Sequence, residues 1–280
     1  MIKTDIIIIG AGPCGLFAVF EAGLLKMRCH LIDFLPQPGG QCSEIYPKKP
    51  IYDIPGFPKI LAGDLVTNLM DQIKPFSPGF TLGERVENIA KKDDNFFYVT
   101  TNRGTKHRGK VIVIAAGLGC FEPRKPSVSN LMSFEDKGVD YIIKDPNKYK
   151  DKKVIISGGG DSALDWVIYL AKGIAREITL VHRRESFRGH LDSVDQVYEL
   201  SKAGKINLLT NAEVVDLEGE KHLNSVTIQS SENSLVKDAD YWIPLFGLTP
   251  KLGPIANWGL NLDKNQINVN PEDYSTNVPG

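Results

Sequence analysis

Two short runs of β-branched residues are each followed by a glycine-rich turn and a longer apolar segment. The first run covers residues 5–9 and leads into GAGPCG, and the second covers residues 153–157 and leads into GGGDSA. A short continuous apolar run is typical of a strand that is buried on both faces. The segments LFAVFEAGLLK and DSALDWVIYLAKG, which follow the two turns, have the length of helices. The pattern therefore predicts two strand–turn–helix units.

Further elements are predicted around these units. After the helix of each unit comes another apolar run, over residues 28–33 in the first and 177–181 in the second. A proline- and glycine-rich loop, then a helix, then three strands are expected over residues 35–58, 62–76, 81–89, 96–101 and 109–114. Strands that alternate with helices are typical of a parallel sheet, so the fold class is predicted to be α/β.

Two of the predicted strands end near a glycine at which the chain turns, Gly117 and Gly247. We place the two crossovers between domains at these glycines. The first domain is then discontinuous, with residues 1–117 and 247–280, and the second, residues 118–246, is inserted in it. Since each domain contains one strand–turn–helix unit, both are predicted to be Rossmann-like dinucleotide-binding domains.

The first glycine turn has the spacing of a dinucleotide-binding fingerprint. Gly10 permits the tight turn, Gly12 lets the backbone approach a pyrophosphate, and Gly15 lets the helix pack closely on the strand. The next strand ends in Asp33, whose carboxylate can accept hydrogen bonds from a ribose diol and would repel a 2′-phosphate. This site is therefore predicted to bind FAD or NAD rather than NADP. Cys14, inside the turn, is expected to be a small packed residue.

The second glycine turn points to a phosphorylated nucleotide. Its small residues are Gly158, Gly160 and Ala163, and the helix begins at Asp161 and Ser162. The next strand ends in HRRESFR instead of an acid, with His182, Arg183, Arg184 and Arg188. Guanidinium groups match the geometry of a dianionic 2′-phosphate. A solvated basic turn is the alternative, but the position after a glycine turn favours NADP.

The charge balance and the cysteines exclude several classes of function. With 33 basic and 34 acidic residues the formal net charge is −1, which gives no electrostatic reason for binding nucleic acid or a membrane surface. Four cysteines without a C-x-x-C pair are too few for a disulfide framework, and the histidines have no metal-ligand spacing. No apolar run has the length of a signal-peptide core or a membrane span. We expect a cytoplasmic protein without a metal.

Several longer stretches carry a resemblance to one family. They are PQPGGQCSEIYPKKPIYDIPGFP, AAGLGCFEPRK, SGGGDSALDW, HRRESFRGH and LGPIANWGL. The sequence resembles the two-domain flavoprotein reductases of the thioredoxin reductase type, and among them the ferredoxin–NADP reductases built on that fold. The resemblance implies FAD and NADPH as cofactors, a ferredoxin or flavodoxin-like electron carrier as partner, and a homodimer.

The resemblance also assigns residues by position. It implies that Asp33 holds the FAD ribose, and that Gln41, Tyr46 and Phe121 lie around the flavin. By the same likeness Val86 contacts the adenine side. The residues implied to hold the NADP 2′-phosphate are Arg183, Arg184 and Arg188.

Cys42, in GGQC, raises the question of a redox dithiol. In flavoenzymes of the glutathione reductase type, a redox cysteine at this place has its partner five residues on, where this chain has Pro47. In the thioredoxin reductase type the pair lies just before the second glycine turn, and residues 138–145 contain no cysteine. Cys42 is therefore expected to be a packed residue near the flavin, with a lone sulfenic-acid role as the minor alternative. No catalytic side chain is predicted, since the flavin performs the chemistry.

The predicted function is hydride transfer from NADPH to FAD, followed by transfer of single electrons to an iron–sulfur or flavodoxin carrier. Candidates for a basic rim that meets an acidic carrier are Lys48, Lys49, Lys59, Arg124 and Lys125. Two alternatives stay open: a related enzyme with a quinone, flavin or oxygen acceptor, and a nucleotide-binding protein without turnover. The resemblance implies a further strand and helix after residues 274–280, so the sequence is expected to be a fragment.

Overall fold

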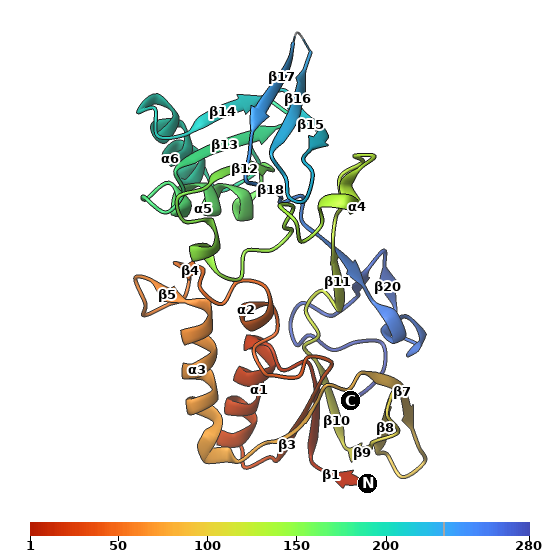
Figure 1. The fold of residues 1–280 in the computed structure, drawn as a ribbon. Coiled ribbons are helices and arrows are strands. Elements are labelled where there is room, and N and C mark those ends of the chain that lie inside the picture. Colours follow the sequence, from red (N-terminus) through yellow and green to blue (C-terminus); the bar gives the residue numbers. More distant parts are fainter. Residues whose placement is uncertain (232) are drawn as a thin grey trace. The chain divides into compact units, whose positions relative to one another are not determined.

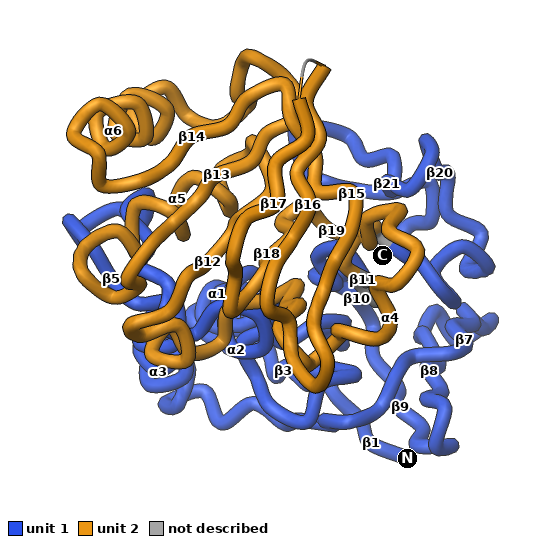
Figure 2. Tube along the Cα trace, turned by 45° about the horizontal axis from the view of Figure 1, so that its top comes forward, with its two compact units in different colours: residues 1–121, 250–280 blue, residues 122–249 orange. Residues whose placement is uncertain are grey.

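The structure is a computed structural model that describes residues 1–231 and 233–280 (Figure 1), and the side chains of residues 120–122 and 250 lie outside this description. The chain divides into two compact units, which Figure 2 colours separately. Unit 1 consists of residues 1–121 and 250–280, and unit 2 consists of residues 122–249. Each unit has its own parallel sheet and its own hydrophobic core.

The parallel sheet of unit 1 has four strands in the order β10-β2-β3-β6. They are β2 (Ile6–Ile9), β3 (Cys29–Asp33), β6 (Gly79–Leu82) and β10 (Val111–Ile114). Ile6 and Ile8 of β2 pack with residues of the helices α1 (Pro13–Leu24) and α3 (Ala62–Ile73). Ile7 and Ile9 pack in a second cluster, with Val86 and Val99. Because β2 is buried on both faces, its sequence is a continuous apolar run.

A second sheet of unit 1, in the order β1-β9-β8-β7, supplies Val86 and Val99 to that second cluster. Its strands are β1 (Ile2–Lys3), β7 (Val86–Lys91), β8 (Phe97–Thr101) and β9 (Lys106–Gly109). The pairings are antiparallel except that β1 runs parallel to β9. The short elements of the unit are α2 (Gln41–Glu44), β4 (Pro50–Ile51), β5 (Ile60–Leu61), η1 (Lys74–Phe76), η3 (Gly253–Asn257), β20 (Leu262–Asp263) and β21 (Gln266–Ile267).

Unit 2 has a parallel sheet in the order β14-β13-β12-β18. Its strands are β12 (Lys153–Ser157), β13 (Glu177–His182), β14 (Asn207–Thr210) and β18 (Tyr241–Pro244), and its main helices are α5 (Asp161–Leu170) and α6 (Leu191–Lys202). An antiparallel meander consists of β15 (Ala212–Glu218), β16 (Ser225–Ser230) and β17 (Ser234–Asp238). The meander shares a core with Ile155, Val181 and Trp242 of the parallel sheet. Two short helices, α4 (Leu131–Phe134) and η2 (Pro146–Tyr149), precede β12.

The chain passes between the units through β11 (Cys120–Pro123) and β19 (Leu248–Lys251), which pair in a two-stranded sheet. Gly117 and Gly247, the predicted crossover glycines, have φ values of +57° and +89°. These values are in the left-handed region that favours glycine. The assignment of FAD to the first domain and NADP to the second stays a prediction.

Two of the predicted strands are wrong in extent. Residues 81–89 contain the end of β6 and the start of β7, and residues 109–114 contain the end of β9 and all of β10. In both places the chain leaves one sheet and enters the other, at Gly83 (φ +69°) and at Lys110. A run of apolar and β-branched residues predicts a strand without showing which sheet it joins. The prediction of an α/β fold is confirmed.

Candidate nucleotide-binding sites

The first glycine turn joins β2 to α1 in unit 1. Gly10 has φ +107°, and a Cβ atom there would collide with the backbone of Ala115. A Cβ atom on Gly15 would collide with the Gly10 carbonyl oxygen. Among the described residues, a Cβ atom on Gly12 would meet only the Cα of Gly40, at 3.9 Å. Gly10 and Gly15 are therefore required by the fold, whereas Gly12 leaves room for a ligand.

The start of α1 is open to an anion. Gly12 is its N-cap residue, Pro13 is its first residue, and no side chain caps it. The first backbone N–H groups of a helix have no intrahelical partner, and the helix dipole places partial positive charge there. A pyrophosphate fits this turn for the same reason that it fits other helix N-termini.

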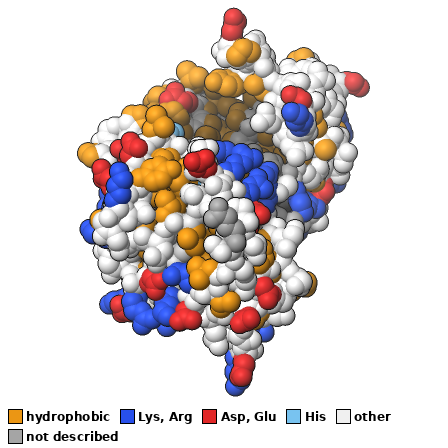
Figure 3. Space-filling model, turned by 90° about the horizontal axis from the view of Figure 1, so that it is seen from above, with side chains coloured by type: hydrophobic (Ala, Val, Ile, Leu, Met, Phe, Trp, Pro, Cys, Tyr) orange, Lys and Arg blue, Asp and Glu red, His pale blue; other side chains and the backbone are white. Residues whose placement is uncertain are grey.

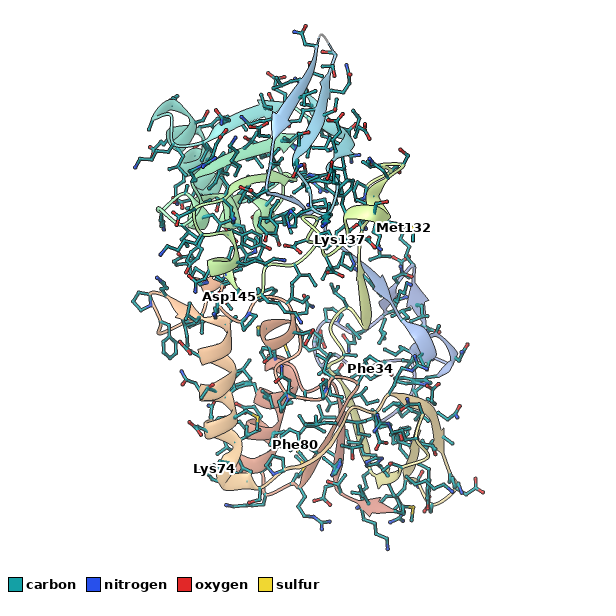
Figure 4. The ribbon with its side chains drawn as sticks, viewed as in Figure 1. Phe34, Lys74, Phe80, Met132, Lys137 and Asp145 are labelled. Atoms are coloured by element: carbon teal, nitrogen blue, oxygen red, sulfur yellow. The ribbon has the colours of Figure 1, made fainter. Side chains whose placement is uncertain are left out.

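Asp33, the last residue of β3, binds the backbone with both carboxylate oxygens. Oδ2 accepts a hydrogen bond from the Ala11 N–H at 2.6 Å, and Oδ1 accepts one from the Leu35 N–H at 2.8 Å. Each oxygen retains a second lone pair, so the carboxylate can also accept from a ribose hydroxyl. The next side chain, Phe34, is exposed (Figure 4). Asp33 therefore shapes the glycine turn and remains able to bind a ribose.

The Gly-Gly pair of GGQC contacts this turn. The Gly39 N–H donates to the Ala11 carbonyl oxygen at 2.8 Å, and Gly40 has φ +56°. A Cβ atom on Gly40 would lie 3.1 Å from the Cα of Gly12. Sequence reasoning missed both glycines as part of the site, although adjacent glycines before a helix are a signal of close backbone approach. Their contact holds the start of α2, and with it Gln41, against the glycine turn.

Cys42 is a buried core residue, as predicted. Burial raises the pKa of its thiol, partly opposed by a hydrogen bond with Tyr46 and reinforced by Cys14. Burial likewise raises the pKa of Tyr46 to about 12. Both groups are therefore protonated at neutral pH, and Cys42 lacks the thiolate character of a redox nucleophile.

The other predicted residues around FAD differ in their surroundings. Gln41 lies close to Gly117, where a Cβ atom would be 3.7 Å from the Gln41 Nε2. Val86 is buried in the core with its side chain, so only its backbone is left to meet a ligand. The side chain of Phe121 lies outside the described residues. The expectation for Cys14 is wrong, because this side chain is exposed.

The second glycine turn joins β12 to α5 in unit 2. A Cβ atom on Gly158 would lie 2.7 Å from the Leu245 carbonyl oxygen, so this glycine is required by packing. A Cβ atom on Gly160 would have no described atom within 4 Å, which leaves space beside the turn. Ala163 is fully buried, and Ser162 is exposed. No side chain caps α5, so its first amides are open to an anion.

The segment after β13 folds back onto this turn. Its exposed basic residues are Arg183, Arg184 and Arg188. The Arg188 N–H donates to the Gly159 carbonyl oxygen at 2.7 Å. His182 differs from the arginines, since it is only 7% exposed and stacks on Phe187. The three guanidinium groups are accessible to a phosphate, and the imidazole is not.

Asp161, the first residue of α5, contacts the end of the same segment. Its Oδ1 accepts a hydrogen bond from the His190 N–H at 2.8 Å. A carboxylate would repel a phosphate placed against it, whereas its bond to His190 fixes the fold of the basic segment. The structure therefore gives Asp161 a contact within the protein, and its predicted contact with NADP stays a prediction.

The residues of the predicted basic rim belong to both units. Lys48, Lys59 and Arg124 are exposed. Lys125 forms an ion pair with Glu135 at 2.6 Å. Basic and apolar side chains gather together on the face seen in Figure 3. These observations do not place the basic residues on one surface, and the role of these residues in docking a carrier stays a prediction.

Metal-binding and membrane-spanning features were searched for in the described ranges. Residues 1–231 and 233–280 contain no group of three or more His, Cys, Asp or Glu side chains arranged to hold a metal ion. Within the same ranges, no helix is both long enough and apolar enough to cross a membrane.

The sequence is similar to those of known reductases. The pattern of the pyridine nucleotide-disulphide oxidoreductases matches residues 4–280. Ferredoxin–NADP reductase 1 of Christiangramia forsetii is 68% identical over 284 residues, which cover 100% of this chain and 80% of the relative. The ferredoxin–NADP reductase of Flavobacterium johnsoniae is 63% identical over 281 residues, with the same coverage. The chain belongs to the ferredoxin–NADP reductase family.

Solved structures confirm the predicted thioredoxin reductase-like fold of this reductase. Thioredoxin reductase of Lactococcus lactis has a TM-score of 0.84 at 23% identity, covering 99% of this chain and 88% of that one. Thioredoxin reductase of T. acidophilum has a TM-score of 0.86 at 22% identity, covering 100% and 88%. At these identities the likeness concerns the fold alone.

Membership in the family confirms FAD and NADPH as the cofactors of the reductase. The residues present fit both. Unit 1 combines an uncapped helix start, the open side of Gly12 and a carboxylate suited to a ribose diol. Unit 2 combines an uncapped helix start, the open side of Gly160 and three exposed arginines. Which residue holds which part of each cofactor stays a prediction.

Proposed function

We propose that this reductase passes electrons from NADPH through FAD to ferredoxin or to a similar iron–sulfur or flavodoxin carrier. The observation that carries the proposal is the 68% and 63% identity to relatives named ferredoxin–NADP reductase. The sequence supports it as well, because Pro47 and residues 138–145 leave no second cysteine for a redox dithiol. FAD, when bound, would supply the redox chemistry, which is acceptance of a hydride and release of single electrons.

In unit 1 the residues bind and orient FAD. The free amides at the start of α1 receive the pyrophosphate, and Gly12 allows its close approach. Asp33 accepts hydrogen bonds from the adenosine ribose with the lone pairs that its backbone contacts leave free. Gln41 and Tyr46 lie around the flavin ring, and Val86 contacts the adenine side through its backbone.

In unit 2 the residues bind NADPH. The amides at the start of α5 receive the pyrophosphate beside Gly160. Arg183, Arg184 and Arg188 pair with the 2′-phosphate, which NADH lacks. Selection of NADPH over NADH therefore depends on charge that is already gathered in one exposed segment.

The test is an anaerobic titration of the purified, flavin-loaded protein, followed through its visible spectrum. We expect NADPH to bleach the flavin far more readily than NADH, and oxidised ferredoxin to restore the colour. A matched variant, Arg188→Gln, should weaken the response to NADPH and leave the response to NADH unchanged. Colour that returns with a quinone or oxygen but not with ferredoxin would contradict the proposed acceptor. Equal bleaching by NADH and NADPH would contradict the arginine assignment.

We further propose that the reductase is a homodimer located in the cytoplasm. The support is the resemblance of its sequence to dimeric reductases and a cysteine content too low for a disulfide framework. Sedimentation of the purified protein tests the first point, and fractionation of cells tests the second.

A further inference from the structure

The imidazole of His182 is enclosed within the second glycine turn. A Cβ atom on Gly159 would collide with the His182 ring, and its three nearest atoms would all be atoms of that ring. The glycine backbone therefore lies against the face of the ring. The ring also stacks on Phe187, with centroids 4.9 Å apart and planes 19° from parallel. His182 is thus held by packing and is directed into the protein.

A hydrogen bond closes the segment on itself. His182 Nε2 lies 3.1 Å from the carbonyl oxygen of Ser186. A carbonyl oxygen has no proton, so Nε2 carries the proton and donates it. This bond and the stack with Phe187 hold the residues between them, Arg183 and Arg184 included, in one compact turn.

Two further bonds attach the far end of the segment to the start of α5. The Arg188 N–H donates to the Gly159 carbonyl oxygen at 2.7 Å, and the His190 N–H donates to Asp161 Oδ1 at 2.8 Å. The segment is therefore held by contacts within the protein, without a contribution from the nucleotide. Ordering a segment on binding lowers affinity, so a turn that is already held in shape preserves affinity.

We propose that His182 is a positioning residue for NADPH selectivity: its stacked ring holds the arginine turn in the shape that receives a 2′-phosphate, and it makes no contact with the nucleotide. This proposal rests on the proposed function in one respect, that the arginines bind the phosphate. The proposal differs from the sequence-based prediction, in which His182 contacts NADP. Burial lowers the pKa of His182, the hydrogen bond to the Ser186 carbonyl partly opposes this, and the charges of Arg183, Arg184 and Arg188 lower the pKa further. A neutral ring offers no charge to a phosphate.

The test uses two halves of the nucleotide that differ in the 2′-phosphate alone. Binding of 2′,5′-ADP and of 5′-AMP to the full chain is measured by titration calorimetry at about pH 8, where a free imidazole is neutral. We expect His182→Ala to lower the affinity for 2′,5′-ADP by about tenfold and to leave the affinity for 5′-AMP unchanged. His190→Ala is the matched control, because this side chain is 86% exposed at the end of the same turn and its Nε2 lies 3.9 Å from Asp161 Oδ1, beyond hydrogen-bond distance. The backbone N–H of residue 190, which donates to Asp161 Oδ1 at 2.8 Å, is kept in the alanine variant. It should bind both ligands like the unchanged protein.

The outcomes separate this proposal from the function on which it rests. Arg188→Ala should lower the affinity for 2′,5′-ADP whatever the role of His182. Normal binding of 2′,5′-ADP by this variant would overturn the phosphate site itself. If Arg188→Ala binds weakly while His182→Ala binds normally, the positioning role is wrong and the phosphate site stands. The positioning role is also overturned if His182→Ala loses as much affinity for 5′-AMP as for 2′,5′-ADP. Should His182→Ala fail to fold, Phe187→Leu removes the other side of the stack and is expected to give the same selective loss.

Discussion

A buried pair of histidines in unit 1 illustrates how single residues acquire properties that their sequence positions do not reveal. His30 is 8% exposed and His107 is 0% exposed, and their ring centroids lie 4.9 Å apart. The Thr81 hydroxyl lies 2.8 Å from Nε2 of His30 and 3.0 Å from Nε2 of His107. Since a hydroxyl has one proton, it donates to one ring and accepts from the other. The hydrogen bonds therefore join β3, β6 and β9.

The surroundings of the pair favour neutral rings. Burial lowers the pKa of His30 to about 4, and a charge on His107 adds to this effect. Burial lowers the pKa of His107 as well, with Glu84 opposing and the chain's amino terminus adding to the shift. In the unfolded chain both histidines titrate near their ordinary pKa of about 6.5. As the pH falls below that value, the unfolded chain binds more protons than the folded one, so stability is lost.

We predict that the free energy of unfolding falls between about pH 7 and about pH 5, with on the order of 2 kcal/mol of the loss coming from His30. Urea unfolding at the two pH values measures it. In His30→Asn the difference between the two pH values should shrink by that amount, whatever the variant's absolute stability. His190→Asn, at an exposed position, should keep the full difference. A His30→Asn protein with an unchanged pH dependence would show that the pair does not titrate in this way.

At the scale of the element, the glycines of the turn between β2 and α1 are needed for two different reasons, packing and ligand binding. A Cβ atom on Gly15 would collide with the Gly10 carbonyl oxygen, so packing within the folded protein requires glycine there. Gly12 has φ −73°, which alanine adopts freely, and a Cβ atom there would make only an ordinary contact with Gly40. A requirement for glycine at Gly12 must therefore come from the ligand.

We predict that two alanine substitutions in this turn affect different properties, one the stability and the other the affinity for FAD. Gly15→Ala should lower the free energy of unfolding by about 1–3 kcal/mol through overpacking. Gly12→Ala should change stability by less than about 0.5 kcal/mol and should weaken FAD binding by about tenfold or more. Thermal unfolding of the flavin-free protein and titration with FAD measure the two effects. Normal FAD affinity in Gly12→Ala would exclude the close approach of a pyrophosphate.

At the scale of the whole molecule, the division into two units corresponds to separate hydrophobic clusters in each unit. Unit 2 is a continuous stretch of chain, and its parallel sheet and meander share one core around Trp242. The indole N–H of Trp242 donates to the Ser157 hydroxyl at 2.8 Å, so the polar group of this buried ring is satisfied within the unit. A domain with its own core is expected to fold by itself.

We predict that residues 122–249, expressed alone, fold and bind 2′,5′-ADP. Circular dichroism should give a mixed α/β spectrum with a cooperative thermal transition, and calorimetry should give an affinity close to that of the full chain. Trp242→Ala should abolish the transition, because it empties the centre of the core. A fragment with the spectrum of an unfolded chain would show that unit 2 depends on unit 1.

Much of the fold could be predicted because its signals are local. The runs at residues 5–9 and 153–157, the glycine turns and Asp33 all lie within a few dozen residues of the elements that they define. The predictions failed where the deciding partner is distant. The pattern over residues 81–89 predicts one strand, but its two halves pair with strands of different sheets.

The sequence by itself determined the α/β class, the two nucleotide turns and their expected order along the chain, because backbone conformation and charge act at short range. Only the tertiary structure decided which side chains of these segments turn outward. It exposes Arg188 and buries His182 in one turn, places Gly40 against Gly12, and brings His30 to His107. Each of these outcomes depends on contacts with other segments, which are Gly159 for His182, Gly12 for Gly40 and His107 for His30. The periodicity of one segment contains no information about the segment that packs against it.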